Sequence, residues 1–185
     1  ISGLLLMMVA IYWSLLWVAL VYMLSLLLYQ NLAYNSIAND SSKLPMFRSL
    51  QLGWQELKRN TAMWQITWMV VVINTTGGMF EIQMIYSAKA LFGFSSLQIG
   101  LMFSMAGLGA FIGAFLAPYI RQTAGLGQTL KWAVLAEGIV FLLPVLSPTP
   151  VALYTAMFLV SLFSICSNIC IWSYRQESTS QELVG

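Results

Sequence analysis

The chain has 185 residues and a formal net charge of +2; 59% of its residues are hydrophobic and only 8% are charged. Soluble domains carry about 25% charged residues, so this composition excludes a soluble globular protein. The few, scattered basic residues also exclude a nucleic-acid-binding surface, and the expected partner is the lipid bilayer. With a mean hydropathy of +0.80, the sequence predicts an all-α polytopic membrane protein.

The first apolar run covers residues 3–33. A helix of that length would extend for about 46 Å, whereas the hydrocarbon core of a bilayer is about 30 Å thick. Tyr12 and Trp13 form an aromatic pair of the kind that is found at membrane interfaces. We therefore expect the end of one span at residues 1–11 and a complete span at 13–32; one long tilted helix is the alternative. Because the chain opens inside an apolar run, without Met, we expect a fragment.

The only extended polar segment covers residues 35–60 and contains half of the basic residues. Within it, apolar side chains recur at helical spacing at Phe47, Leu50, Trp54 and Leu57. This pattern predicts an amphipathic helix that lies in the membrane interface. A solvated linker is the alternative interpretation.

Four further spans are predicted, separated by short turns that contain glycine or proline, at residues 62–86, 97–120, 130–146 and 151–174. Short connections imply that consecutive spans are antiparallel. Seven of the eight basic residues fall on one side of the predicted membrane, and only Lys89 falls on the other. Because basic residues favour the cytoplasmic side, we predict that residues 35–60 and 121–131 are cytoplasmic.

The span at residues 62–86 contains the polar residues that we expect to face a substrate or proton pathway. Thr67, Asn74 and Glu81 fall on one helical stripe, and polar groups inside a membrane usually face protein or a water-filled path. The glycine pair beside them permits a bend or a local unwinding, as at carrier substrate sites. We predict that Glu81 gains and loses a proton during transport. Alternatively, it pairs with Lys89 or lies in water near the outer surface.

Small and polar residues also mark the spans at residues 97–120 and 151–174. Gly109 and Gly113 form a GxxxG motif, which predicts close packing against another helix. Ser161, Ser164 and Asn168 share one face of the last span. Such a face suits either hydrogen bonds between helices or the lining of a cavity, and we include it in the predicted pathway.

Glu137 is the other carboxylate inside a predicted span. It follows Lys131 by six residues, so we expect it near the cytoplasmic edge of the membrane. There it would form a structural pair with Arg121 or Lys131.

No enzyme active site, cofactor or metal site is predicted. The sequence has no histidine, so serine–histidine pairs and histidine metal ligands are missing. The only aspartate, Asp40, lies in a predicted loop, and no phosphate-binding glycine loop occurs. Cys166 and Cys170 would share a helix face, and we expect them to be ordinary core residues.

Residues 100–125 resemble the eighth helix and the following turn of major facilitator superfamily transporters. The residues that carry the resemblance are Gly100-Leu101-Met102-Phe103, Gly107-Leu108-Gly109-Ala110 and Gly113-Ala114-Phe115-Leu116-Ala117-Pro118, then Arg121 and Gly125. The similarity is strongest to the efflux branch of macrolide-efflux and enterobactin-exporter proteins, although Pro118 replaces an acidic residue of the fuller signature. Residues 53–60 and 175–185 resemble the segments before the seventh and after the tenth helix of that branch.

The resemblance implies a partial major facilitator fold of about five and a half transmembrane helices. Its parts would be the end of an N-terminal helical half (1–34), a cytoplasmic linker (35–60) and the first four helices of a C-terminal half (61–185). It further implies a secondary active transporter that exports drug-like or amphipathic small molecules by alternating access, with the proton as coupling ion.

Two alternatives stay open at this point. One is a carrier of the same fold for another solute, such as a siderophore, and the other is a non-transporting scaffold or channel. In the family that the chain resembles, helices seven, eight and ten help to line the central cavity, whereas helix nine is peripheral. The resemblance therefore favours Asn74 and Glu81 as cavity residues over Glu137.

Overall fold

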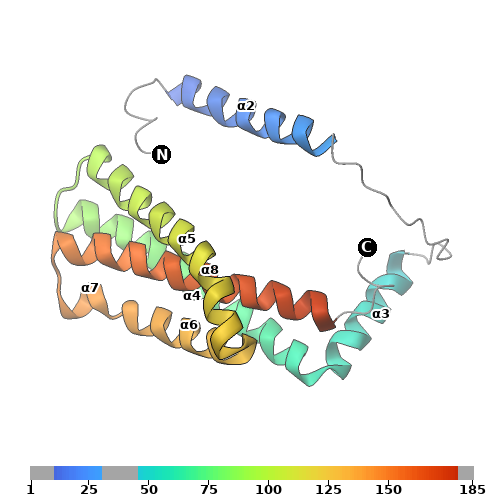
Figure 1. Ribbon diagram of the computed structural model, residues 1–185. Coiled ribbons are helices and arrows are strands. Elements are labelled where there is room, and N and C mark those ends of the chain that lie inside the picture. Colours follow the sequence, from blue (N-terminus) through green and yellow to red (C-terminus); the bar gives the residue numbers. More distant parts are fainter. Residues whose placement is uncertain (1–10, 31–45, 179–185) are drawn as a thin grey trace.

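The computed structural model describes residues 11–30 and 46–178, which form helices and no β-strand (Figure 1). In chain order the helices are α2 (Ile11–Gln30), α3 (Met46–Arg59), α4 (Thr61–Ala90), α5 (Ser96–Ala124), α6 (Leu126–Val140), α7 (Leu143–Leu146) and α8 (Pro150–Ser178). The predicted all-α class is confirmed for this part of the chain. The predicted partial span at residues 1–11 and the start of the polar linker at 35–45 fall almost wholly outside the described residues.

Among the described residues, three helical segments are long and apolar enough to cross a membrane: Ser96–Ala124, Leu126–Leu146 and Pro150–Ser178. The chain is therefore a helical protein with membrane-spanning segments. Helix α4 is 30 residues long and has polar residues at its centre, and it is not among these segments. The stretch Leu15–Leu27 of α2 is a shorter apolar helix.

Local sequence determines where the helices begin. Asn60 separates α3 from α4, and its side-chain oxygen accepts a hydrogen bond from the Met63 backbone amide at 3.1 Å. Ser95 and Gln98 form a reciprocal capping box at the start of α5, which satisfies amide groups that have no partner within the helix. Gly125 ends α5 with a φ of 79°, a conformation that glycine adopts without steric cost.

The segment predicted as one span at residues 130–146 consists of two helices. Helix α6 ends at Val140, and a turn at residues 141–142 leads into α7. Pro144 explains the break, because proline has no amide hydrogen and its ring would collide with the carbonyl group of Val140 in a continuous helix.

Helix α8 is the centre of the bundle. It packs against α5, α6, α4 and α7, and its longest contact is with α5. Figure 1 shows α8 crossing the middle of the assembly, with α5 and α6 alongside it. Helix α2 lies apart from this bundle, and its side chains from Leu15 to Leu27 are exposed (Figure 1).

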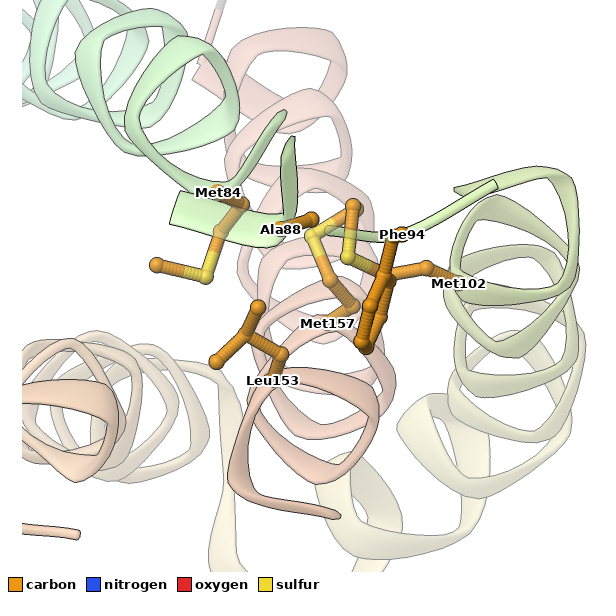
Figure 2. Close-up of a cluster of buried hydrophobic side chains, with 6 residues drawn as sticks. All are labelled: Met84, Ala88, Phe94, Met102, Leu153 and Met157. Carbon is orange, nitrogen blue, oxygen red and sulfur yellow. The ribbon is translucent and has the colours of Figure 1, made fainter. Parts of the chain in front are cut away.

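One apolar cluster joins α4, α5 and α8 towards the C-terminal end of α4. Its buried members are Met84, Ala88, Phe94, Met102, Leu153 and Met157, whose side chains converge between the three helices (Figure 2). Phe94 comes from the α4–α5 connection, and its ring stacks on Tyr154 with centroids 5.6 Å apart. This cluster fixes one end of α4 against α8.

Two smaller clusters hold the opposite end of the bundle. Ala117, Ala133 and Cys166 join α5, α6 and α8. Leu130, Cys170 and Ile171 join α6 and α8, and Ile66, Met69 and Val70 of α4 pack against them. Helix α4 is therefore anchored to α8 at both ends, with its polar central part between the two anchors.

The GxxxG motif of α5 faces α8 at the closest helix crossing. A Cβ atom added at Gly113 would lie 2.5 Å from the carbonyl oxygen of Leu162, and one added at Gly109 would overlap the carbonyl group of Phe158. The thiol of Cys166 donates to the carbonyl oxygen of Gly113 at 3.4 Å. Only glycine allows the two backbones to approach this closely.

Residues 46–59 form the helix that the amphipathic pattern predicts, and most of its apolar face is exposed. Phe47 is 82% exposed, and Leu50 and Trp54 are also exposed. Lys58 lies 5.1 Å from the ring centroid of Trp54, and that ring packs edge-on against Trp64. Apolar side chains left open in this way suit contact with lipid.

Candidate functional site

A partly open cavity of about 300 Å³ is lined by residues of α4, α5, α6 and α8. Its polar lining consists of Asn74, Glu81, Glu137, Ser161 and Ser164. Its apolar walls include Phe80, Phe103, Met157 and Val160. A cavity with apolar walls and a few convergent polar groups is the usual form of a small-molecule site.

The apolar clusters explain why the cavity exists. Helix α4 contacts its neighbours through Met84 and Ala88 at one end and through Met69 and Val70 at the other. Between these contacts, the residues of α4 that line the cavity are Ile73, Asn74, Gly77, Gly78, Phe80 and Glu81. The polar central part of α4 thus lies beside the cavity.

The polar groups of the cavity lie near the centres of their helices. Asn74 stands next to the middle of α4, and Ser164 stands at the middle of α8. Glu137 is adjacent to residue 136, the midpoint of the membrane-crossing segment Leu126–Leu146. Carriers bind substrate and coupling ions at this depth.

Glu137 is the most buried of the ionisable groups in this lining. It is 4% exposed, and one carboxylate oxygen, Oε2, has no hydrogen-bond partner. The Ser164 side chain interacts with the same carboxyl group. Glu137 therefore presents an incompletely satisfied carboxylate at the centre of the bundle.

The predicted pairing of Glu137 at the cytoplasmic edge is wrong. The Arg121 guanidinium group donates to Ser173 Oγ at 2.8 Å and forms an ion pair with Glu177. Lys131 lies over the ring of Trp132. Arg121 thus contacts residues at the end of α8, and within the described residues Glu137 forms no ion pair with Arg121 or Lys131.

Glu81 and Asn74 have more exposed side chains than Glu137. Both line the cavity, so they occupy its open side, on α4. Lys89 lies eight residues further along the same helix, roughly 12 Å away, and the described residues include no ion pair between Glu81 and Lys89. Glu81 is therefore placed at the exposed side of the cavity.

The cavity brings together Asn74, Glu81, Ser161 and Ser164, but not Thr67 or Asn168. The Thr67 hydroxyl donates to the Met63 carbonyl oxygen at 2.8 Å, and the Asn168 amide donates to the Ser164 carbonyl oxygen at 3.0 Å. Such bonds within a helix satisfy a polar side chain without a ligand. These two residues lie outside the lining.

The glycine pair of α4 lies in the cavity wall without breaking the helix. Helix α4 is continuous through Gly77 and Gly78, so the local unwinding that the pair permits does not occur here. No atom lies within 4 Å of a Cβ atom added at either glycine. Here glycine leaves space rather than allowing close packing.

A second hollow of about 470 Å³ lies between α4 and α6 near Met69, Leu130 and Val134. Its lining is almost wholly apolar, with Lys131 at its edge. Without converging polar groups it lacks the features of a specific site, and the smaller cavity is the better candidate. The described residues contain no group of three or more His, Cys, Asp or Glu that could hold a metal ion.

Three residues of the cavity lining were not predicted as such from the sequence: Glu137, Phe80 and Phe103. A signal for Glu137 was present, because it stands close to the middle of its apolar segment, where a carboxylate is costly. The two phenylalanines gave no signal, since apolar residues in a membrane helix face lipid and protein alike.

No family model matches the chain, and no curated protein or solved structure is significantly similar to it. The class that the fold and the cavity define is a helical membrane protein with a partly polar cavity inside its bundle.

Proposed function

We propose that this chain is part of a secondary active transporter of the major facilitator type, which exports drug-like or amphipathic small molecules in exchange for protons. The observation that carries the proposal is the cavity, which is lined by Asn74 and Glu81 of α4 and by Glu137 and Ser164 of the apolar segments Leu126–Leu146 and Pro150–Ser178. The cavity is the substrate path, and Glu81 is the group that exchanges a proton with water.

Energetic cost supports this proposal. Polar and ionisable side chains inside a bilayer are expensive, and they usually mark substrate or proton pathways. Here two carboxylates and an amide share one cavity near the helix centres. Their aromatic and methionine neighbours provide the adaptable apolar walls that suit amphipathic ligands.

The proposed topology places residues 35–60 and 121–131 in the cytoplasm. Its main support is the distribution of basic residues. A further support is the ion pair between Arg121 and Glu177, which brings the ends of α5 and α8 together. Both ends fall on the side where the basic residues gather.

Labelling with an impermeant thiol reagent in intact cells tests this topology. Gln128→Cys, in the proposed cytoplasmic turn, should resist the reagent until the membrane is permeabilised. Thr149→Cys, in the opposite turn, should react at once; both positions are exposed. The native thiols Cys166 and Cys170 are buried, and the unsubstituted protein measures their background. Reversed labelling would overturn the orientation.

Transport in proteoliposomes tests the function itself. A pH gradient should drive movement of ethidium, an amphipathic fluorescent probe, and a protonophore should stop it. Flux that ignores the gradient would indicate a channel, and an absence of flux for ethidium and for a ferric siderophore would indicate a scaffold. Transport of the siderophore alone would favour the other-solute carrier.

A further inference from the structure

The hollow between α4 and α6 has an apolar interior and a basic edge. It measures about 470 Å³ and is lined by Met69 of α4 and by Gly127, Leu130, Lys131, Val134 and Leu135 of α6. Leu130 is 9% exposed and Leu135 is 48% exposed, so the hollow is closed on one side and open on the other. From residue 127 to residue 135 it follows α6 for roughly 12 Å. The hollow is therefore an open groove along the outside of the bundle.

The lining of this groove suits a hydrocarbon chain. Sites for drug-like ligands combine apolar walls with a few converging polar groups, and the groove has no such group apart from Lys131. A hydrocarbon chain needs no polar partner, because its binding depends on the apolar area that it buries. Met69, Leu130 and Val134 provide that area.

Tryptophan rings beside basic side chains indicate the level of the membrane interface at this end of the bundle. Ring centroids lie 5.1, 5.6 and 5.5 Å from the charged groups in the pairs Trp54 with Lys58, Trp132 with Lys131, and Trp172 with Arg175. Both residue types favour the headgroup region, where the apolar part of the side chain meets hydrocarbon and the polar part meets water. The pairs belong to α3, α6 and α8, so three helices indicate the same level.

The groove therefore begins at the headgroup level and continues towards the hydrocarbon region. Helical side chains lean towards the start of their helix, so the stem of Lys131 leans towards Gly127 and the interface. Val134 and Leu135 lie further along α6, away from that interface. A positive charge at the outer end and apolar walls at the inner end match the two parts of a phospholipid.

Charge favours an anionic lipid as the occupant. Within residues 11–30 and 46–178, every basic residue except Lys89 belongs to α3 or to this end of the bundle, and basic clusters beside a membrane attract anionic lipids. An apolar helix, from another segment or from a second copy of the chain, would cover the groove without bringing a negative charge to Lys131. An anionic lipid supplies both the apolar chain and the charge.

We propose that the groove between α4 and α6 binds an acyl chain of an anionic phospholipid, whose phosphate group lies beside Lys131. The lipid fills the space between the two helices and thereby supports the packing of α4 against α6. The groove is separate from the cavity lined by Glu81 and Glu137, so this lipid site does not depend on the proposed transport.

Titration of the delipidated full-length protein, followed by native mass spectrometry, tests the charge preference. The probes are phosphatidylglycerol, which is anionic, and phosphatidylcholine, which is zwitterionic, with identical acyl chains. The first phosphatidylglycerol should bind about fivefold more tightly than the first phosphatidylcholine, the effect of one basic residue at an anionic surface. Lys131→Gln should remove this preference without changing the affinity for phosphatidylcholine, and Lys131→Arg should retain it. Equal affinities of the wild type for both lipids would overturn the proposal.

Arg48→Gln is the matched control for charge. It removes the same charge from an exposed position of α3, outside the groove. It should weaken the binding of phosphatidylglycerol less than Lys131→Gln does. Equal losses in the two variants would assign the preference to the overall charge of this end of the bundle and would contradict a site at Lys131.

Gly127→Leu tests the acyl-chain part of the site. No atom lies within 4 Å of a Cβ atom added at this position, so the new side chain can occupy the groove. Both lipids should then bind about tenfold more weakly, the effect of displacing about two buried methylene groups. Gly138→Leu is the control, because its added Cβ atom is equally free of contacts and it lies outside the groove. Wild-type affinities in a folded Gly127→Leu protein would contradict the proposal.

The remaining outcomes separate this proposal from the others. If the wild type binds neither lipid, another helix or a second copy covers the groove, and the proposal is wrong. If Gly127→Leu does not fold, the comparison of Lys131→Gln with Arg48→Gln decides. The titration needs neither substrate nor gradient, so its failure would leave the transporter standing, and a lack of transport would leave the lipid site standing.

Discussion

Glycines on the two sides of helix α8 have opposite structural roles. Towards α5, Gly109 and Gly113 leave room for the backbone of α8 itself. Towards α4 and α6, α8 borders the cavity, and Gly77 and Gly78 have no atom within 4 Å of an added Cβ atom. Glycine thus allows close packing between α5 and α8, whereas in α4 it leaves space beside the cavity.

This contrast shows that a glycine pattern does not by itself reveal its purpose. Each pair lies inside a long helix, but Gly109 and Gly113 are four residues apart, whereas Gly77 and Gly78 are adjacent. What distinguishes them is the neighbour: Phe158 and Leu162 of α8 lie against the α5 pair, whereas the α4 pair borders a space with two carboxylates. We propose that the α5–α8 contact is structural and that the cavity is the transport path.

The largest effect is expected on export, from substitution of a residue that lines the cavity. Glu81→Gln keeps the shape of the side chain but cannot exchange a proton, so proton-driven export of ethidium in proteoliposomes should be abolished. Asn74→Ala changes a neighbouring lining residue without removing a charge and should reduce export only in part. If Glu81→Gln exports ethidium at the normal rate and with the usual pH dependence, Glu81 takes no part in proton exchange and is only a hydrated side chain.

The next largest effect is expected on stability, at the close contact between α5 and α8. Gly113→Leu would force α5 and α8 apart and should lower the free energy of unfolding by about 2 kcal/mol or more, the usual cost of overpacking. Gly107→Leu is the matched control, because no atom lies within 4 Å of its added Cβ atom. Thermal unfolding in detergent should distinguish the two variants; equal melting temperatures would mean that α8 does not pack there.

A smaller effect is expected where α5 and α8 end. Arg121→Ala removes the contacts with Ser173 and Glu177. The two charged side chains are 33% and 59% exposed, so water screens them and the loss of stability should be about 0.5 kcal/mol. Unfolding at two salt concentrations checks the cause, since high salt should reduce the difference from wild type. A difference that is insensitive to salt would point to packing instead.

The smallest effect is expected from Gly78→Ala. The added methyl group meets no other atom, and alanine is the better helix former by roughly 1 kcal/mol. The variant should therefore be as stable as wild type or slightly more stable in thermal unfolding. Clear destabilisation would mean that α4 packs against something at this point.

Much of this arrangement can be predicted from the sequence, for reasons that are local. Asn60, Ser95 and Gly125 mark helix ends because their side chain or backbone suits a cap, and the period of 3.6 residues places Asn74 and Glu81 on one face. These features depend on neighbours within a few residues.

The role of Glu137 could not be predicted in the same way. Whether it meets Arg121 or Ser164 depends on how α6 is rotated about its axis and how far it is shifted along α8. Contacts such as those of Leu130, Ala133 and Cys166 fix that setting, and they join residues that are distant in the sequence. The resemblance to major facilitator transporters also implies that the helix of Glu137 is peripheral, which favoured Asn74 and Glu81 as cavity residues over Glu137.

The assignment of transport to the cavity is tested most directly by filling it. Gly78→Leu places a bulky side chain in the cavity wall, where no atom lies within 4 Å of the added Cβ atom. We predict that proton-driven export of ethidium is lost while the melting temperature stays at the wild-type value, the reverse of stability lost in Gly113→Leu. Wild-type export by a folded Gly78→Leu protein would contradict the assignment.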